Sequence, residues 1–267
     1  MKNVIEKYPF ISGIILVILT MVLPWGLMYP LSNYLDTYLY GGLKYLASLV
    51  IAALLIFLIY KDMPFEIKKG FTIKALFTFG LLGIIGAIMP LLFSYEEVDI
   101  TPTALTIVEF IFYVLMIAVS EEFIFRVVIL NLMLKKFSLS KKDILKAKIL
   151  ASIIFGIRHF LNLITMPATP ISTTAQVVFT FMAGVYLCAL YLRTRSIWIC
   201  VLIHFLEDFS SLFWGVLSTG ALTSSNEDGE PLMMLGMVVI QSVYVLFGVL
   251  MIRDKNFSYQ SLERIKR

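Results

Sequence analysis

Long runs of apolar residues, separated by short polar segments, fill most of the chain. A helix crosses a bilayer core with about 20 mostly apolar residues, and about eight runs approach or reach that length. The pattern predicts an all-α integral membrane protein with about eight transmembrane helices. The fourth run is too long for one perpendicular span, so we expect it to tilt, break or emerge on one side. The runs are Phe10 to Met28, Tyr45 to Tyr60, Thr72 to Phe93, Ala104 to Leu134, Ile149 to Ile164, Thr174 to Leu192, Ile197 to Leu217 and Leu232 to Ile252.

Composition supports a membrane protein, because 60% of the residues are hydrophobic and only 15% are charged. An ordinary soluble chain carries roughly 25% charged residues. The first run follows Lys2 and Lys7, as a signal peptide would, but it has the length of a span and lacks a cleavage site of small residues. We therefore expect it to be a retained helix. Cys188 and Cys200 lie inside apolar runs and are expected to be small core residues.

Charge alternates between successive connections. Basic residues follow the second, fourth, sixth and eighth runs, and those after the fourth extend from Lys135 to Lys148. The intervening connections are acidic or uncharged. The positive-inside rule then places both termini and every basic loop in the cytoplasm. The net charge of +4 is part of this topology signal, so no nucleic-acid partner is expected. We interpret residues 1–267 as one polytopic domain that crosses a bacterial cell membrane several times and is surrounded by the lipid bilayer.

Ionisable side chains inside the apolar runs mark the candidate site. A charge at the centre of a bilayer costs at least about 2.5 kcal/mol, so each such group needs a partner or a task. Both histidines of the chain belong to this set, and histidine is well suited to proton transfer and to metal binding. We interpret Arg158 as a counter-charge and Glu109 and Glu207 as partners or lining residues. The set is Glu109, Glu121, Glu122, Arg126, Arg158, His159, His204, Glu207 and Asp208.

Depth predicts that three helices bring reactive groups together. With about 1.5 Å of rise per helical residue, Glu122, His159 and His204 lie about 20, 16 and 13 Å inward from the nearest basic residue. For His159 that residue is Lys148. Residues four apart share a helix face, which applies to Glu122 with Arg126, Phe155 with His159, and His204 with Asp208.

One alternative concerns the fourth run, which could stop near Ser120. Ser120 would then cap a second, interfacial helix whose first turn carries Glu121 and Glu122, as the helix dipole favours. The carboxylates would lie at the cytoplasmic surface, and a catalytic role would still be open to them.

Three motifs occur in order on successive apolar segments: E-E-x-x-x-R at 121–126, F-x-x-x-H at 155–159, and H-x-x-x-N/D at 204–208. This set resembles the CAAX protease and bacteriocin-processing family, also written CPBP or Abi, over about Thr103 to Gly215. The resemblance implies an eight-helix intramembrane endopeptidase with a polar cavity open toward the cytoplasmic side, acting on a peptide or protein substrate at the membrane.

The resemblance also implies residue roles. Glu121 would be the base that activates water with help from His159, and His204 with the residue at 208 would stabilise the oxyanion. Glu122 and Arg126 would complete the site as an orienting ion pair. Peptide hydrolysis needs these kinds of group, because a base must take a proton from water and donors must face the developing negative charge.

The chain departs from the prenyl-protein members at Asp208, where they carry Asn. An ionised Asp cannot donate a hydrogen bond to an oxyanion. Asp208 would then be protonated, orient His204, or help to hold a metal. Glu121, His159 and His204 would be the ligands if zinc is bound. The chain has no H-E-x-x-H helix, so we favour a mechanism that requires no cofactor.

Two other classes of function fit a membrane protein with buried Glu and His. One is a proton- or ion-coupled transporter, although the paired repeats typical of transporters are absent from the sequence. The other is a non-catalytic immunity or scaffold protein in which the polar residues only hold helices together. The ordered motifs favour the peptidase.

Overall fold

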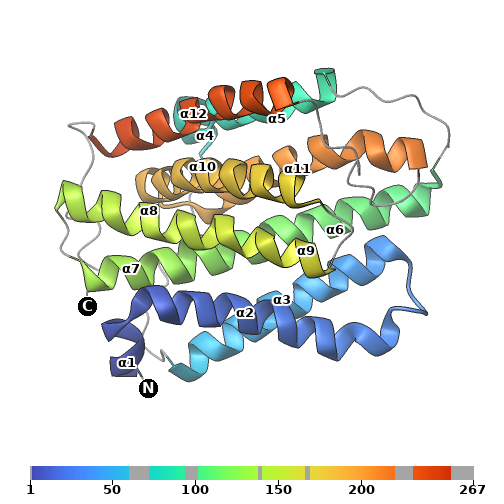
Figure 1. The fold of residues 1–267 in the computed structure, drawn as a ribbon, viewed down its shortest axis with the longest axis horizontal. Coiled ribbons are helices and arrows are strands. Elements are labelled where there is room, and N and C mark those ends of the chain that lie inside the picture. The colour runs from blue at the N-terminus through green and yellow to red at the C-terminus, as the bar shows by residue number, and fades with distance from the viewer. Residues whose placement is uncertain are drawn as a thin grey trace.

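Long helices lie side by side along one axis of the molecule (Figure 1). The structure, a computed structural model, describes residues 2–59, 72–93, 102–137, 140–165, 169–219 and 231–253. Every regular element within those ranges is helical, which confirms the all-α class. The elements are α1 (Lys2–Lys7), α2 (Pro9–Met28), α3 (Thr37–Ile59), α4 (Ile73–Phe79), α5 (Leu81–Phe93), α6 (Ala104–Glu122), a π-helical segment (Phe123–Ile129), α7 (Leu130–Lys136), α8 (Lys141–Ile157), α9 (Asn162–Thr165), α10 (Pro170–Thr194), α11 (Ile197–Thr219) and α12 (Pro231–Arg253), with 3-10 turns at Tyr29–Leu31 and Arg158–Leu161.

Six helical segments in the described residues are long and apolar enough to cross a membrane. They coincide with six of the expected runs, and the other two form α4 with α5, and α12. The chain is therefore a multi-pass integral membrane protein. The six segments are Pro9–Leu31, Thr37–Leu58, Ala104–Lys136, Lys141–Ile164, Pro170–Thr194 and Ile197–Leu217.

Two expected helix starts were wrong, because α3 begins at Thr37 and α8 at Lys141. The early start of α8 also corrects the expectation that Lys148 lies in a cytoplasmic loop. Lys148 is fully buried, and its Nζ donates to the backbone carbonyl of Gly248 at 2.5 Å. Hydropathy treats lysine as a surface residue, but the apolar stem can pack in a core once the amine has an acceptor.

The fourth apolar run stays helical throughout, as α6, the π-helical segment and α7. The alternative in which Ser120 caps a second helix was wrong. Ser120 is buried within α6, and its hydroxyl donates to the carbonyl of Ile117 at 3.3 Å, a bond inside the helix. The helix then widens directly after Glu122, and single turns of π-helix are frequent at functional sites.

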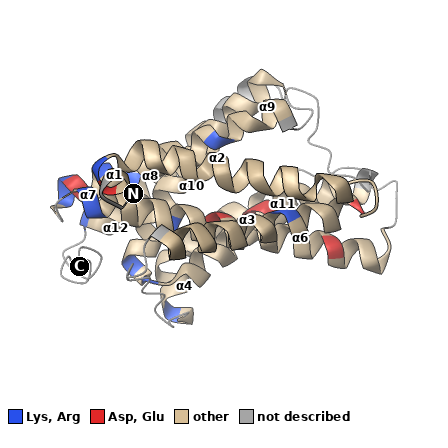
Figure 2. Cartoon of the chain, turned by 90° about the horizontal axis from the view of Figure 1, so that it is seen from below, with Lys and Arg blue, Asp and Glu red and all other residues tan. Residues whose placement is uncertain are grey.

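The bundle is tightly packed toward the end where the basic residues gather. Lys and Arg cluster near α1 and α7, whereas acidic residues also lie along the middle and toward the other end (Figure 2). Between the middle and the basic end, Val127, Met133, Ile144, Leu190 and Ile199 are fully buried. Within this core α10 packs on α8 and α12, while α11 packs on α5 and α6.

The close approach of α12 to α10 should make Gly248 intolerant of any side chain. A Cβ added at Gly248 would lie 2.9 Å from the carbonyl oxygen of Val185 and 3.2 Å from the Cα of Tyr186, and backbone cannot move aside as a side chain can. We expect Gly248→Ala to lower the free energy of unfolding by about 1–3 kcal/mol. Thermal unfolding in detergent measures this. Gly26→Ala is the control, because a Cβ there meets nothing within 4 Å.

Candidate active site

The two adjacent carboxylates end α6 at the centre of the bundle. Glu121 is 2% exposed and Glu122 is fully buried. The ion pair expected between Glu122 and Arg126 is present, with Arg126 Nε 3.0 Å from Glu122 Oε2 and both side chains fully buried. The guanidinium group also lies 4.4 Å from the centre of the Phe155 ring, a cation–π contact that further fixes its position.

His204 reaches this pair from α11. Its Nδ1 lies 2.8 Å from Glu122 Oε1, which is hydrogen-bonding distance. Its Nε2 lies 3.8 Å from Glu121 Oε2 and 3.4 Å from Asp208 Oδ2, so three carboxylates surround one imidazole. The spacing of four residues predicted that His204 and Asp208 share a face, and the contact confirms it.

Arg158 is the partner of Glu121. Its guanidinium group forms a buried ion pair and hydrogen bond with Glu121 Oε1. Arg158 begins the 3-10 turn that follows α8, and this turn carries the side chain toward α6. The sequence predicted Arg158 as a counter-charge without identifying its partner, and the structure supplies Glu121.

His159 lies beside this cluster, on the same 3-10 turn. Its Nδ1 is 3.5 Å from Asn162 Nδ2, at the outer limit of a hydrogen bond. Its Nε2 is buried and has no hydrogen-bond partner among the described residues. That nitrogen is therefore available to a water molecule or a substrate group.

Phe155 links the two histidines. Its ring centre lies 6.1 Å from that of His159 and 5.9 Å from that of His204, and both contacts are edge-to-face. Phe125 packs against the same ring at 4.6 Å. The phenylalanine of the F-x-x-x-H motif thus has a physical role, because its ring lies between the two imidazoles and contacts the guanidinium group of Arg126.

Two acidic residues of the candidate set lie apart from the cluster. Glu207 Oε1 accepts a hydrogen bond from the Tyr244 hydroxyl at 2.6 Å, so Glu207 joins α11 to α12. This pairing could not be predicted from the sequence, because Tyr244 lies in another apolar run with no motif around it. Glu109 is half-buried on α6, several turns before the cluster.

The described residues contain no group of three or more His, Cys, Asp or Glu side chains placed to hold one metal ion. Glu121 and His204 are instead engaged by Arg158 and Glu122. As arranged here, Glu121, His159 and His204 do not fit zinc coordination, so no step below passes through a metal.

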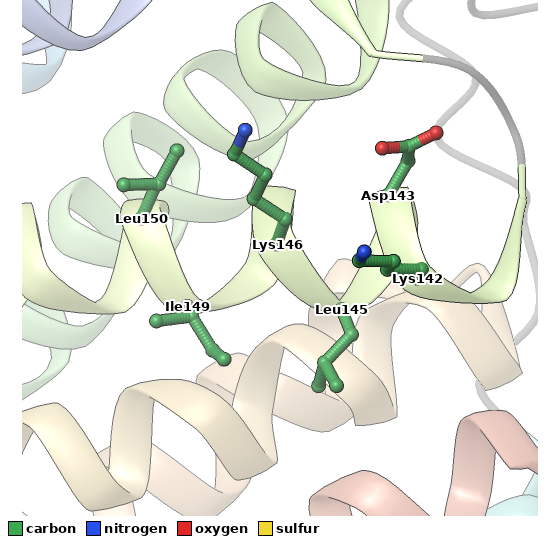
Figure 3. Close-up of a pocket in the computed structure, with 6 residues that line it drawn as sticks. All are labelled: Lys142, Asp143, Leu145, Lys146, Ile149 and Leu150. Atoms are coloured by element: carbon green, nitrogen blue, oxygen red, sulfur yellow. The ribbon is translucent and has the colours of Figure 1, made fainter.

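Two surface hollows among the described residues lie away from this cluster. One is an apolar groove between α4, α5 and α12. The other lies along α8 at the basic end (Figure 3), with Lys142, Asp143, Leu145, Lys146, Ile149 and Leu150 around it. The polar cavity stays a prediction, and the residues expected to line it form a buried polar cluster.

Comparison with known proteins gives the family of this segment. The model of a family described as type II CAAX prenyl endopeptidase, Rce1-like, matches residues 103–210, a range that includes all three motifs and their buried cluster. No curated protein and no solved structure matches the chain. The resemblance seen in the motifs is thereby confirmed: residues 103–210 match the Rce1-like type II CAAX prenyl endopeptidase family.

Proposed function

We propose that this protein is an intramembrane endopeptidase that hydrolyses peptide bonds of membrane-associated peptides or proteins. One observation carries the proposal. Side chains from three separate helices, Glu121, Arg158 and His204, meet in a buried cluster inside the segment that matches an endopeptidase family. Ionisable groups at membrane depth are costly, so such a convergence favours a catalytic role over packing.

In the proposed mechanism Glu121 is the general base. The ion pair with Arg158 engages Oε1 and leaves Oε2 for a water molecule. Glu121 takes a proton from that water as the oxygen attacks the carbonyl carbon of the peptide bond. The resulting tetrahedral intermediate collapses when the C–N bond breaks, and the proton held by Glu121 passes to the leaving amine. The unpartnered Nε2 of His159 is placed to hold the water or the amine during these transfers.

His204 is proposed to stabilise the oxyanion. Glu122 accepts from Nδ1 at 2.8 Å and thereby fixes the ring orientation, and Arg126 in turn fixes Glu122. A protonated imidazole would then present its Nε2–H to the negative oxygen of the intermediate. Two guanidinium groups and one imidazolium would balance the three carboxylates of the cluster, which a low-dielectric interior requires.

Asp208 is proposed to orient His204. Its Oδ2 lies 3.4 Å from His204 Nε2, which is long for a charge-assisted hydrogen bond. A substrate oxygen could therefore replace Asp208 at this nitrogen. This role needs no protonated Asp208 and no metal.

The test compares the parent protein with Glu121→Gln. New peptide termini in membranes from cells that make either protein are quantified by mass spectrometry, and candidate peptides, including a prenylated C-terminal peptide, are then assayed with purified protein in liposomes. Termini that depend on Glu121 identify substrates. An identical set of termini from both proteins would contradict the proposal.

Metal removal separates the two mechanisms that the sequence left open. We expect purified parent protein to carry far less than one zinc per chain and to keep its activity in EDTA, because Glu121 and His204 already have protein partners. Elemental analysis measures the zinc. Stoichiometric zinc that disappears in a His159→Ala and His204→Ala double variant would restore the ligand set Glu121, His159 and His204.

A further inference from the structure

We propose that the hydroxyl group of Tyr45, on α3, is a second hydrogen-bond donor to the oxyanion of the proposed reaction. This inference rests on the proposed function, because it adds a catalytic residue to the same site. Tyr45 lies outside residues 103–210, so neither the three motifs nor the family match points to it. The active site would therefore include a helix that the matching segment does not contain.

The proposed site contains one assigned donor to the oxyanion, which is His204 Nε2. The neighbouring side chain, Asp208, cannot donate a hydrogen bond while it is ionised. Enzymes that stabilise a tetrahedral intermediate direct preorganised donors at the point where the negative charge develops. Carboxylates close to this point would also repel a negative oxygen, so a further donor there would have a large effect on the rate.

Two glycines allow α3 to pack closely along α6 (Figure 1). A Cβ added at Gly41 would lie 2.6 Å from the ring of Tyr113, and one added at Gly42 would lie 3.3 Å from its Cα. Tyr45 follows these glycines by about one turn, on the same side of α3. Its ring centre lies 6.0 Å from that of Tyr113, in an edge-to-face contact. The Tyr45 ring is therefore held against the helix that ends in the two catalytic carboxylates.

The Tyr45 hydroxyl group lies beside the ion pair between Arg158 and Glu121. It interacts with the guanidinium group of Arg158, which also holds Glu121 Oε1. It is close enough to Glu121 and Asp208 for their charges to act on it. His204 Nε2 lies 3.8 Å from Glu121 Oε2 and 3.4 Å from Asp208 Oδ2. The hydroxyl and this nitrogen thus face the same two carboxylates, and an oxygen bound at the nitrogen would lie near the hydroxyl.

The chemistry of Arg158 decides in which direction the hydroxyl group donates. A guanidinium group has five N–H donors and no acceptor, so Tyr45 must be the acceptor in their interaction. The O–H hydrogen of Tyr45 is therefore left for another oxygen. A hydroxyl that accepts from a charged group is also a stronger donor, because successive hydrogen bonds polarise one another. The same guanidinium group would thus fix the base, Glu121, and strengthen the donor, Tyr45.

Tyr38 offers a matched control on the same helix. It lies two turns before Tyr45 on the same face, and its ring centre is 6.2 Å from that of Tyr113. The Tyr38 side chain is 1% exposed, and its hydroxyl has no hydrogen-bond partner among the described residues. Tyr38→Phe removes a hydroxyl from the same aromatic group without removing a donor from the site, so it should cleave at a rate close to that of the parent.

The cleavage rate of Tyr45→Phe tests the proposal. Peptide termini that depend on Glu121 are quantified in membranes, and kcat and KM are then measured in liposomes on a peptide identified in this way. Removal of one oxyanion donor lowers kcat by about 10²–10³, and we expect a loss of that size in Tyr45→Phe. KM should stay close to that of the parent, because the interaction is made only in the transition state.

A purely structural role for Tyr45 is separated by a replacement that keeps a donor. Tyr45→para-aminophenylalanine has the same ring and an N–H group in place of the O–H group, so it should recover most of the kcat that Tyr45→Phe loses. Thermal unfolding in detergent should differ little among the parent and the two variants. A change in packing alone would affect both variants equally.

Three results would overturn the proposal while Glu121→Gln remains inactive. They are a parental kcat in Tyr45→Phe, equal losses in Tyr45→Phe and Tyr38→Phe, and equal losses in Tyr45→Phe and Tyr45→para-aminophenylalanine. If the parent protein produces no termini that depend on Glu121, the proposed function itself fails, and the role of Tyr45 fails with it.

Discussion

The Glu121→Gln variant is expected to lose cleavage by a factor of about 10²–10⁴ in kcat, the usual contribution of a general base. The amide keeps the size of the side chain but cannot take a proton from water. Initial rates on an identified substrate in liposomes measure the loss. Glu109→Gln is the matched control, because it removes a carboxylate from the same helix outside the cluster, and it should retain activity near that of the parent.

Folding must be separated from catalysis in this variant. Removing the Glu121 charge leaves Arg158 buried without its partner, which is destabilising. The double variant Glu121→Gln with Arg158→Met removes both charges and should unfold closer to the parent temperature while still lacking activity. A double variant that is folded and cleaves at the parental rate would show that Glu121 is not the base.

Much of this site could be predicted because membrane burial makes charges informative. The residues that pack against other helices cannot be told apart within an apolar run, but each Glu, Arg or His in the run is easily recognised. A spacing of four residues then places two such side chains on the same face of the helix. The pairs Glu122 with Arg126 and His204 with Asp208 followed from that spacing, and the structure brings both pairs together.

The contacts that escaped prediction join helices distant in sequence. The partner of Arg158 depends on the 3-10 turn after α8, and the partner of Glu207 depends on where α12 packs. The spacing of residues along the sequence does not predict either of these contacts between helices. The burial of Lys148 could not be predicted for another reason. Its hydrogen-bond acceptor is a backbone carbonyl, which any residue could have supplied.

Lys148 illustrates how one buried charge affects an estimate of depth in the membrane. Depth counted from charged residues assumes that every charge lies at an interface, and Lys148 breaks that assumption. The three reactive groups still converge, because the error concerned only the position of the membrane surface along α8. The residues of the cluster could thus be predicted more securely than their distance from the membrane surface.

Breaking the Glu122–Arg126 pair should have the largest effect on stability. Arg126→Met removes the guanidinium partner of the fully buried Glu122 carboxylate and leaves it only the contact with His204, and loss of one partner of a buried pair costs about 3–5 kcal/mol. Chemical unfolding in detergent measures the change. Lys135→Met is the matched control, since Lys135 lies 3.6 Å from Glu6 in a partly exposed pair, and such pairs are worth about 0–1 kcal/mol.

The double variant Glu122→Gln with Arg126→Met separates the contribution of this ion pair to stability from its contribution to catalysis. It removes both charges, so it should recover part of the stability that Arg126→Met loses. It should not recover activity, because an amide holds the His204 ring less firmly than a carboxylate does. Equal stability of Arg126→Met and Lys135→Met would contradict the buried pair, and full activity in the double variant would contradict its orienting role. Stability and catalysis should therefore separate at this pair, since packing needs only charge balance whereas the oxyanion donor needs the carboxylate itself.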